Sequence, residues 1–161
     1  QYVIPKLKEI QKAENKPIRL TVVGDGPYRK ALEDLAVQHD VADMVSFEGQ
    51  KYKEELLPYY QGGDIFVFPS KREGMPNAVL EAMACGLPIV MAPCEGSEEL
   101  IQGNGIVVSA DEMGEALSMV LGKGHLGLWG KERRKRAEDF FSGVSAIGSY
   151  LKLLEKDRKD I

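Results

Sequence analysis

The sequence is poor in cysteine, in long apolar runs and in surplus positive charge, and each shortage excludes a class of protein. Only Cys85 and Cys94 occur in 161 residues, and no histidine lies near them, which excludes a zinc site and favours a reducing, intracellular setting. No stretch reaches the roughly 18 consecutive apolar residues of a membrane-spanning helix. The formal net charge of -4 argues against a domain that grips a nucleic-acid backbone.

What the sequence does contain is an alternation of strand and helix patterns. Hydrophobic residues make up 43% and charged residues 29% of the chain, a balance typical of one globular domain of this length. Short apolar runs predict strands at 18–23, 45–48, 64–69, 88–92 and 105–109. Helical spacing predicts helices after Pro27 and at 53–60, 77–84, 111–121, 130–140 and 144–156. We therefore predict an α/β fold with a Rossmann-like, doubly wound parallel sheet and helices on both faces.

The opening residues have helical spacing, with apolar side chains at Tyr2, Val3, Ile4, Leu7 and Ile10. In a βαβ protein a strand should precede such a helix. We therefore expect residues 1–161 to be one domain, with an all-helical tail, that lacks its first strand.

Four loops follow predicted strands and are candidates for a binding site, at 24–27, 49–52, 70–76 and 93–98. In open parallel sheets the ligand lies beyond the carboxyl ends of the strands, so these loops can converge on one edge. The loop at 70–76 has the most unusual composition. Gly74 leaves backbone amides unobstructed, and a helix that begins near Asn77 offers its N–H groups to a phosphate.

Two carboxylates flank this helix start. Glu73 precedes the helix and can either cap it or accept hydrogen bonds from a sugar. Glu81 lies about a turn beyond Asn77 in an otherwise apolar helix, where a carboxylate needs a hydrogen-bond partner such as the vicinal hydroxyls of a ribose. Taken singly, such glutamates are more often caps or solvated side chains, the turn at Gly24 needs no ligand, and the basic run at 131–136 is typical of a solvated helix face.

Together, residues 69–90 resemble the signature of family 4 retaining glycosyltransferases, also called glycosyl transferases group 1. The motif consists of two glutamates separated by seven residues, here Glu73 and Glu81, followed by Glu-Ala-Met-Ala-Cys-Gly-Leu-Pro at 81–88. The segments at 22–27 and 98–108 resemble the same family in the expected order. The resemblance implies the C-terminal, nucleotide-sugar-binding half of a GT-B fold.

Residue roles follow from this resemblance. Glu73 matches the catalytic residue that engages the donor sugar, and Glu81 matches the one that binds the ribose. The stretch Gly74, Met75, Pro76 and Asn77 matches the segment whose amides contact the sugar and the distal phosphate, and Gly24, Gln50 and Lys51 would lie near the nucleotide. The resemblance implies neither a cofactor nor a metal, since the nucleoside-diphosphate sugar is a substrate.

The resemblance also implies parts that have no counterpart in these residues. Relatives hold the diphosphate with an Arg and a Lys ahead of this segment, and an N-terminal domain holds the sugar or lipid-linked acceptor. We therefore expect the isolated chain to be inactive. We expect the complete protein to build surface polysaccharide or glycolipid in the cytoplasm, in peripheral contact with the inner face of the cell membrane.

Other readings of the same residues stay open. A glycosidase with Glu73 and Glu81 as its carboxylate pair is disfavoured, because consecutive turns of one helix are a poor frame for the separation that such pairs need. A non-catalytic nucleotide- or sugar-binding module remains an alternative, as does a GT-B epimerase or phosphorylase.

Overall fold

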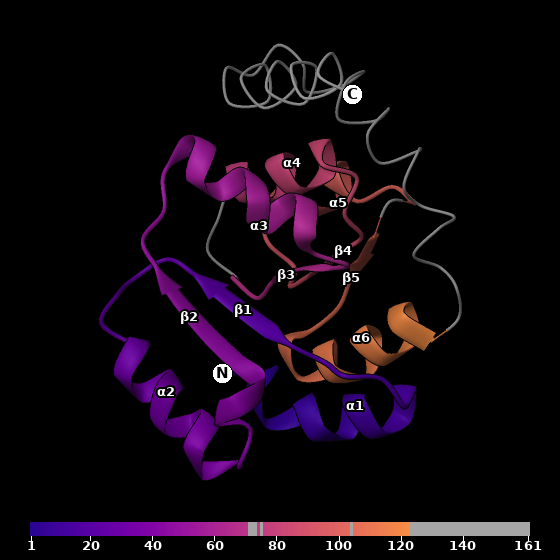
Figure 1. The fold of residues 1–161 in the computed structure, drawn as a ribbon. Coiled ribbons are helices and arrows are strands. Elements are labelled where there is room, and N and C mark those ends of the chain that lie inside the picture. Colours follow the sequence, from indigo (N-terminus) through magenta and orange to yellow (C-terminus); the bar gives the residue numbers. More distant parts are fainter. Residues whose placement is uncertain (71–73, 75, 104, 123–161) are drawn as a thin grey trace, which may run out of the picture.

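The computed structural model describes residues 1–70, 74, 76–103 and 105–122, in which parallel strands alternate with helices (Figure 1). The strands are β1 (Leu20–Val23), β2 (Val45–Gly49), β3 (Phe66–Phe68), β4 (Ile89–Met91) and β5 (Gly105–Val107). The α-helices are α1 (Leu7–Glu14), α2 (Arg29–Gln38), α3 (Leu57–Gly62), α4 (Asn77–Ala84), α5 (Ser97–Leu100) and α6 (Met113–Gly122). Short 3-10 helices lie at Ile4–Lys6, Ala42–Met44, Lys53–Leu56 and Ala110–Glu112.

These elements confirm the predicted α/β class. Four of the five predicted strands contain an observed one, and β2 extends one residue beyond the prediction at 45–48, to Gly49. The helix predicted at 77–84 has the same bounds in the structure. The helix after Pro27 begins two residues later, at Arg29. The helices predicted at 130–140 and 144–156 lie outside the described residues.

The strands pair in two parallel sheets. One sheet has the order β1-β2 and the other the order β3-β4-β5, so within the described residues no ladder joins β1 to β3. Figure 1 shows β1 beside β2, and β3, β4 and β5 grouped separately from them. The predicted parallel pairing is therefore present, although it is divided between two ladders.

Strand β4 is the centre of the three-stranded sheet and contacts a hydrophobic cluster on each face. Its side chains alternate between the two faces, as expected for a strand. Ile89 and Met91 belong to the cluster that includes residues of α3, α4 and α5. Val90 belongs to the second cluster, which includes residues of α1, α2 and α6. The three β4 residues are completely buried, so this sheet is covered by helices on both faces.

The two-stranded sheet contributes to only one of these clusters. Leu20, Val45 and Phe47 pack on the second cluster, with α1 and α2. Neighbouring positions Thr21 and Ser46 point to the other face, where the Ser46 hydroxyl lies 3.3 Å from the Thr21 hydroxyl. All residues of β1 and β2 keep some exposure to solvent.

Local sequence sets both ends of α4. Pro76 is extended and precedes the first helical residue, which fits its inability to donate a backbone hydrogen bond. At the other end Gly86 has φ of 80°, and the N–H groups of Gly86 and Leu87 donate to the carbonyls of Met83 and Ala82 at 2.9 and 3.0 Å. This is the glycine-based helix stop that turns the chain toward β4.

Candidate functional site

The loops after β1 and β2 meet at two glycines. The Gly24 N–H donates to the Gly49 carbonyl at 2.8 Å, and both glycines have positive φ, 123° and 70°. Such backbone angles suit residues without a Cβ, which explains why glycine occupies the position after β1 and the last position of β2. Beyond Gly49, Gln50 is exposed and Lys51 is half-buried. The structure thus brings together the three residues predicted to lie near the nucleotide.

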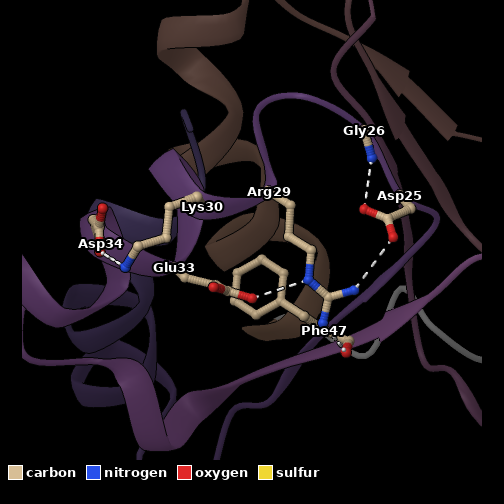
Figure 2. A network of polar contacts seen from close by, with 7 residues as sticks. All are labelled: Asp25, Gly26, Arg29, Lys30, Glu33, Asp34 and Phe47. Carbon is tan, nitrogen blue, oxygen red and sulfur yellow. Dashed lines mark hydrogen bonds and ion pairs between the residues drawn. The ribbon is translucent and has the colours of Figure 1, made fainter.

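Arg29 on α2 holds these two loops in place (Figure 2). Its guanidinium donates to Glu33 Oε1 at 3.0 Å and to the Phe47 carbonyl at 3.2 Å, and it lies 3.7 Å from Asp25 Oδ2. Asp25 in turn accepts from the Gly26 N–H at 2.8 Å. One planar, multiply donating side chain therefore connects the loop after β1, the end of β2 and the first turn of α2.

The predicted phosphate-binding segment leads into α4. Gly74 and Asn77 are exposed and Pro76 is buried, whereas Glu73 and Met75 lie outside the described residues. The first backbone bonds of α4 run from the Val79 and Leu80 N–H groups to the Pro76 carbonyl, at 3.0 and 3.3 Å. The N–H groups of the residues at 77 and 78 precede this ladder, and no side chain caps the helix. This is the kind of helix start that binds anions.

Glu81 stands on the second turn of α4 and accepts a hydrogen bond from a buried tyrosine. The Tyr60 hydroxyl on α3 donates to Glu81 Oε2 at 2.9 Å. The flanking residues Leu80 and Ala82 are fully buried, while Glu81 keeps partial exposure. The prediction that a carboxylate in this apolar helix needs a partner is met here by a protein group.

The neighbouring Tyr59 contacts a second acid. Its hydroxyl donates to Glu48 Oε2 at 3.1 Å, near the end of β2. Partial burial raises the pKa of the Tyr59 phenol above its ordinary value, and the hydrogen bond to Glu48 adds to the rise, because both favour the neutral form. Helix α3 therefore contacts the end of β2, next to the loop that contains Gln50 and Lys51, and also the glutamate of α4.

Sequence reasoning missed Arg29, Tyr59 and Tyr60. The adjacent tyrosines at the end of the helix predicted at 53–60 were the available signal, since buried tyrosine hydroxyls usually find a partner. Nothing in the sequence distinguished Arg29 from the other basic residues on helix faces.

Other features of the described residues do not compete with this edge of the sheets. Two surface hollows border Lys8 and Gln11 of α1, and one of them extends to Asp43 and Met44, at the amino end of β2. Ligands of parallel sheets bind at the opposite, carboxyl ends. Within the described ranges, no group of three His, Cys, Asp or Glu side chains could hold a metal ion. None of the helices described is long and apolar enough to cross a membrane.

Solved structures share this fold. The chain matches a sucrose-phosphate synthase from Thermosynechococcus elongatus with a TM-score of 0.74 and 24% identity, over 98% of this chain and 43% of that one. It matches HepE from Anabaena, solved with UDP-glucose, with a TM-score of 0.75 and 19% identity, over 99% of this chain and 44% of that one. The architecture is that of one half of a GT-B glycosyltransferase.

Sequence comparison gives the family. Residues 1–123 match the family described as glycosyl transferases group 1, and the chain belongs to it. An uncharacterised glycosyltransferase from Haemophilus influenzae is 33% identical over 135 residues, which is 80% of this chain and 37% of the relative. A GDP-mannose-dependent phosphatidylinositol monomannoside mannosyltransferase from Mycobacterium tuberculosis is 34% identical over 63% of this chain and 30% of its own length. The chain thus spans less than half the length of these relatives.

Proposed function

We propose that this chain is the donor-binding domain of a retaining glycosyltransferase, which moves a sugar from a nucleoside-diphosphate sugar to an acceptor. The observation that carries the proposal is the position of the Glu81 carboxylate. It lies on α4, the helix that follows the loop after β3, and accepts a hydrogen bond from Tyr60 of α3. The chain belongs to a family of sugar transferases. HepE was solved with UDP-glucose, and the mycobacterial relative is named as GDP-mannose-dependent. Both names support a nucleotide-sugar donor.

In this proposal the donor lies across the carboxyl ends of the strands. Glu81 accepts hydrogen bonds from the ribose, and the amides from Gly74 to Asn77, with the start of α4, bind the distal phosphate and the sugar. Glu73 engages the hydroxyls of the donor sugar. The loop residues Gly24, Gln50 and Lys51 lie toward the base, on the side that Arg29 holds together.

The chemistry is stabilisation of a leaving diphosphate. When the anomeric carbon loses the diphosphate, negative charge grows on the phosphate oxygens and positive charge on the sugar ring. Backbone N–H groups at the start of α4 stabilise the negative charge on the phosphate oxygens, and the Glu73 carboxylate stabilises the positive charge on the sugar ring. Attack on the face from which the diphosphate leaves gives retention of configuration.

The acceptor class is a further part of the proposal. One relative, from Salmonella typhimurium, is named for colanic acid biosynthesis, and another, from Streptococcus pneumoniae, is named an alpha-monoglucosyldiacylglycerol synthase. These names support a polysaccharide or glycolipid product. The complete protein would then act in the cytoplasm, in peripheral contact with the inner face of the membrane, where its nucleotide-sugar donor and a lipid-linked acceptor meet.

Calorimetric titration of the complete protein with UDP-glucose and GDP-mannose tests the donor assignment. We expect one of them to bind. Glu81→Gln should weaken that binding about tenfold or more, as expected for loss of a hydrogen bond to a charged group. Glu73→Gln should lower turnover at least 100-fold with a smaller effect on affinity. Glu115→Gln, which changes an exposed acid on α6, is the matched control and should do neither.

Three results would count against the proposal. If no nucleotide sugar bound to the complete protein, the donor site would be refuted. Normal donor affinity in Glu81→Gln would refute the contact between Glu81 and the ribose. Binding without transfer to any glycan or lipid acceptor would favour a non-catalytic module. NMR of the product distinguishes retention from inversion at the anomeric carbon.

The open edges of the two sheets support a proposal about the extent of the domain. Phe66 and Phe68 of β3 bond to β4, so the backbone groups of Val67 between them point away from β4. All three β3 residues are only half-buried, although their apolar run is typical of a central strand. We propose that one further parallel strand, ahead of α1 in the complete protein, lies between β3 and β1 and joins the sheets.

Hydrogen exchange tests this strand. In the complete protein the Val67 amide should be protected to a degree similar to the amides of β4. In residues 1–161 alone it should exchange much faster. Equal exchange of Val67 in both proteins would refute the proposal.

A further inference from the structure

Helix α3 directs two adjacent tyrosines at acids on different elements. Tyr59 donates to Glu48 at the end of β2, and Tyr60 donates to Glu81 in α4. Consecutive helical residues point about 100° apart, so a single short helix can contact both. Tyr60 therefore belongs to the donor half of the site through its partner, even though the family motif at 73–81 does not include it.

The phenol of Tyr60 is held firmly. The residue is only 7% exposed, and its ring lies tilted against Phe66 with the ring centroids 5.7 Å apart and an interplanar angle of 51°. The ring of Phe66 in turn stacks on the ring of Phe68, with the ring centroids 6.3 Å apart. A packed aromatic ring with few rotatable bonds places its hydroxyl at one position.

The carboxylate of Glu81 needs such a fixed donor. The last torsion of a glutamate side chain is broad, so burial of the helix face alone leaves the plane of the carboxylate undetermined. A hydrogen bond to Oε2 selects that plane. An ionised carboxylate has about four lone-pair sites, and the bond from Tyr60 occupies one of them.

We propose that Tyr60 is a positioning residue that orients Glu81 for recognition of the ribose hydroxyls of the donor. The inference rests on the proposed function, because it needs Glu81 to contact the ribose. The preference for ribose over deoxyribose then depends on the Tyr60 hydroxyl, which does not itself contact the nucleotide.

The chain offers a matched control. Tyr59→Phe removes the same hydroxyl, one residue away on the same helix, from an acid that the proposal does not place at the ribose. Comparison of Tyr60→Phe with Tyr59→Phe therefore separates the effect on Glu81 from a general effect on α3.

The measurement is the affinity of the complete protein for UDP and GDP and for their 2′-deoxy forms. The quantity compared is the ratio of the ribo to the deoxy affinity for the base that binds. Wild type should prefer the ribonucleotide about tenfold or more, and Glu81→Gln should abolish most of that preference. Tyr60→Phe should weaken ribonucleotide binding about fivefold with little change for the deoxynucleotide. Tyr59→Phe should keep the wild-type ratio.

A purely structural role for Tyr60 predicts a different result, in which both nucleotides lose affinity equally or neither does. That result, with Glu81→Gln still abolishing the preference, would overturn the inference and leave the proposed function standing. An unchanged ratio in Glu81→Gln, or no nucleotide binding in wild type, would overturn the ribose role itself and this inference with it.

A second variant covers the case in which Tyr60→Phe does not fold. Replacement of Tyr60 by 3,5-difluorotyrosine keeps the ring and hydroxyl and makes the phenol more acidic. Its ionisation removes the donated proton, so the ribose preference should fall as the pH rises through that titration. Ionisation of the fluorinated phenol is followed by its ultraviolet absorbance, and wild type should keep its preference over the same range. A ribose preference that stays constant while the fluorinated phenol ionises would refute the inference.

Discussion

The three-stranded sheet has a fully buried central strand, β4, between two half-buried edge strands, whereas both strands of the two-stranded sheet keep some exposure to solvent. The three-stranded half packs apolar clusters on both faces, and its helix α4 places five fully buried side chains against them. The two-stranded half packs one face and is tied by the polar contacts of Arg29. The comparison shows that burial positions helix α4, which carries Glu81, while side-chain hydrogen bonds position the loops after β1 and β2.

The largest expected effect is the loss of stability when a buried side chain is truncated. Leu80 of α4 is fully buried, and Leu80→Ala should lower the free energy of unfolding by about 2–5 kcal/mol, through lost apolar contact and a residual cavity. Leu32 of α2 is only partly buried against its cluster, so Leu32→Ala should cost about 1–2 kcal/mol. Urea unfolding followed by circular dichroism measures both. Equal losses would contradict the contrast between the halves.

The next effect concerns close approach of strands. A Cβ added at Gly105 of β5 would lie 2.4 Å from the Ile89 carbonyl oxygen and 2.9 Å from Ile89 Cβ. Because β4 is packed on both faces and cannot move aside, Gly105→Ala should destabilise by about 1–3 kcal/mol.

Gly26 provides the control in the two-stranded half. A Cβ there meets nothing within 4 Å, so Gly26→Ala should change the free energy of unfolding by less than about 0.5 kcal/mol. The same urea titrations compare the two. A cost for Gly26→Ala as large as that for Gly105→Ala would show that the two-stranded half is packed more tightly than its exposure indicates.

A smaller effect is expected from the polar tie. Arg29→Met removes the bonds to Glu33 and to the Phe47 carbonyl, so we expect a loss of about 1 kcal/mol. Hydrogen exchange at Gly24 and Gly49 should accelerate, because their mutual contact loses its support. Lys30→Met is the control, since within the described part of the chain Lys30 pairs with the exposed Asp34 one turn further along α2, and it should leave these amides unchanged. If the Gly24 and Gly49 amides exchanged at an unchanged rate in Arg29→Met, the role of Arg29 in holding the two loops together would be refuted.

Elements with strong periodicity and clear stop signals were predictable from the sequence. Helix α4 lies between Pro76 and the Cys85-Gly86 stop, and local rules give its bounds. The apolar run at β3 indicated a strand packed on both faces, and its side chains do contact both clusters, with Phe66 and Phe68 in one and Val67 in the other. It is nevertheless half-buried because it lies at the edge of its sheet, which depends on neighbours distant in sequence.

Side-chain partners across elements were not predictable in the same way. The motif marked Glu81 as a carboxylate that needs a partner, but the choice of Tyr60 depends on how α3 packs over β3. Likewise, the contact of Arg29 with the Phe47 carbonyl arises only when α2 lies against β2. Such contacts join residues 18 to 21 positions apart, beyond the reach of local spacing rules.

The smallest expected effect is the response of the two halves to acid and salt. In the two-stranded half, the hydrogen bond and charge of Lys8 lower the pKa of Asp40 below its ordinary 3.8. In the three-stranded half, bonds from the Ser109 hydroxyl and N–H, at 2.7 and 3.0 Å, lower the pKa of Glu112 below 4.5. A depressed folded-state pKa stabilises the fold above the unfolded value, and that contribution is lost as the pH falls through the folded value. Stability should therefore decline below about pH 4.5.

Variants separate the two contributions. Asp40→Asn and Glu112→Gln should each lower stability slightly at pH 7 and flatten part of the decline in acid. In 1 M NaCl the effect of Asp40→Asn should disappear, because the Lys8–Asp40 pair is an exposed ion pair that salt screens. The effect of Glu112→Gln should persist, since its donors are the neutral groups of Ser109. Thermal melts from pH 3 to 7 at low and high salt measure both. If salt abolished both effects alike, the contact between Ser109 and Glu112 would be electrostatic rather than hydrogen-bonded, and the contrast between the halves would not extend to their surfaces.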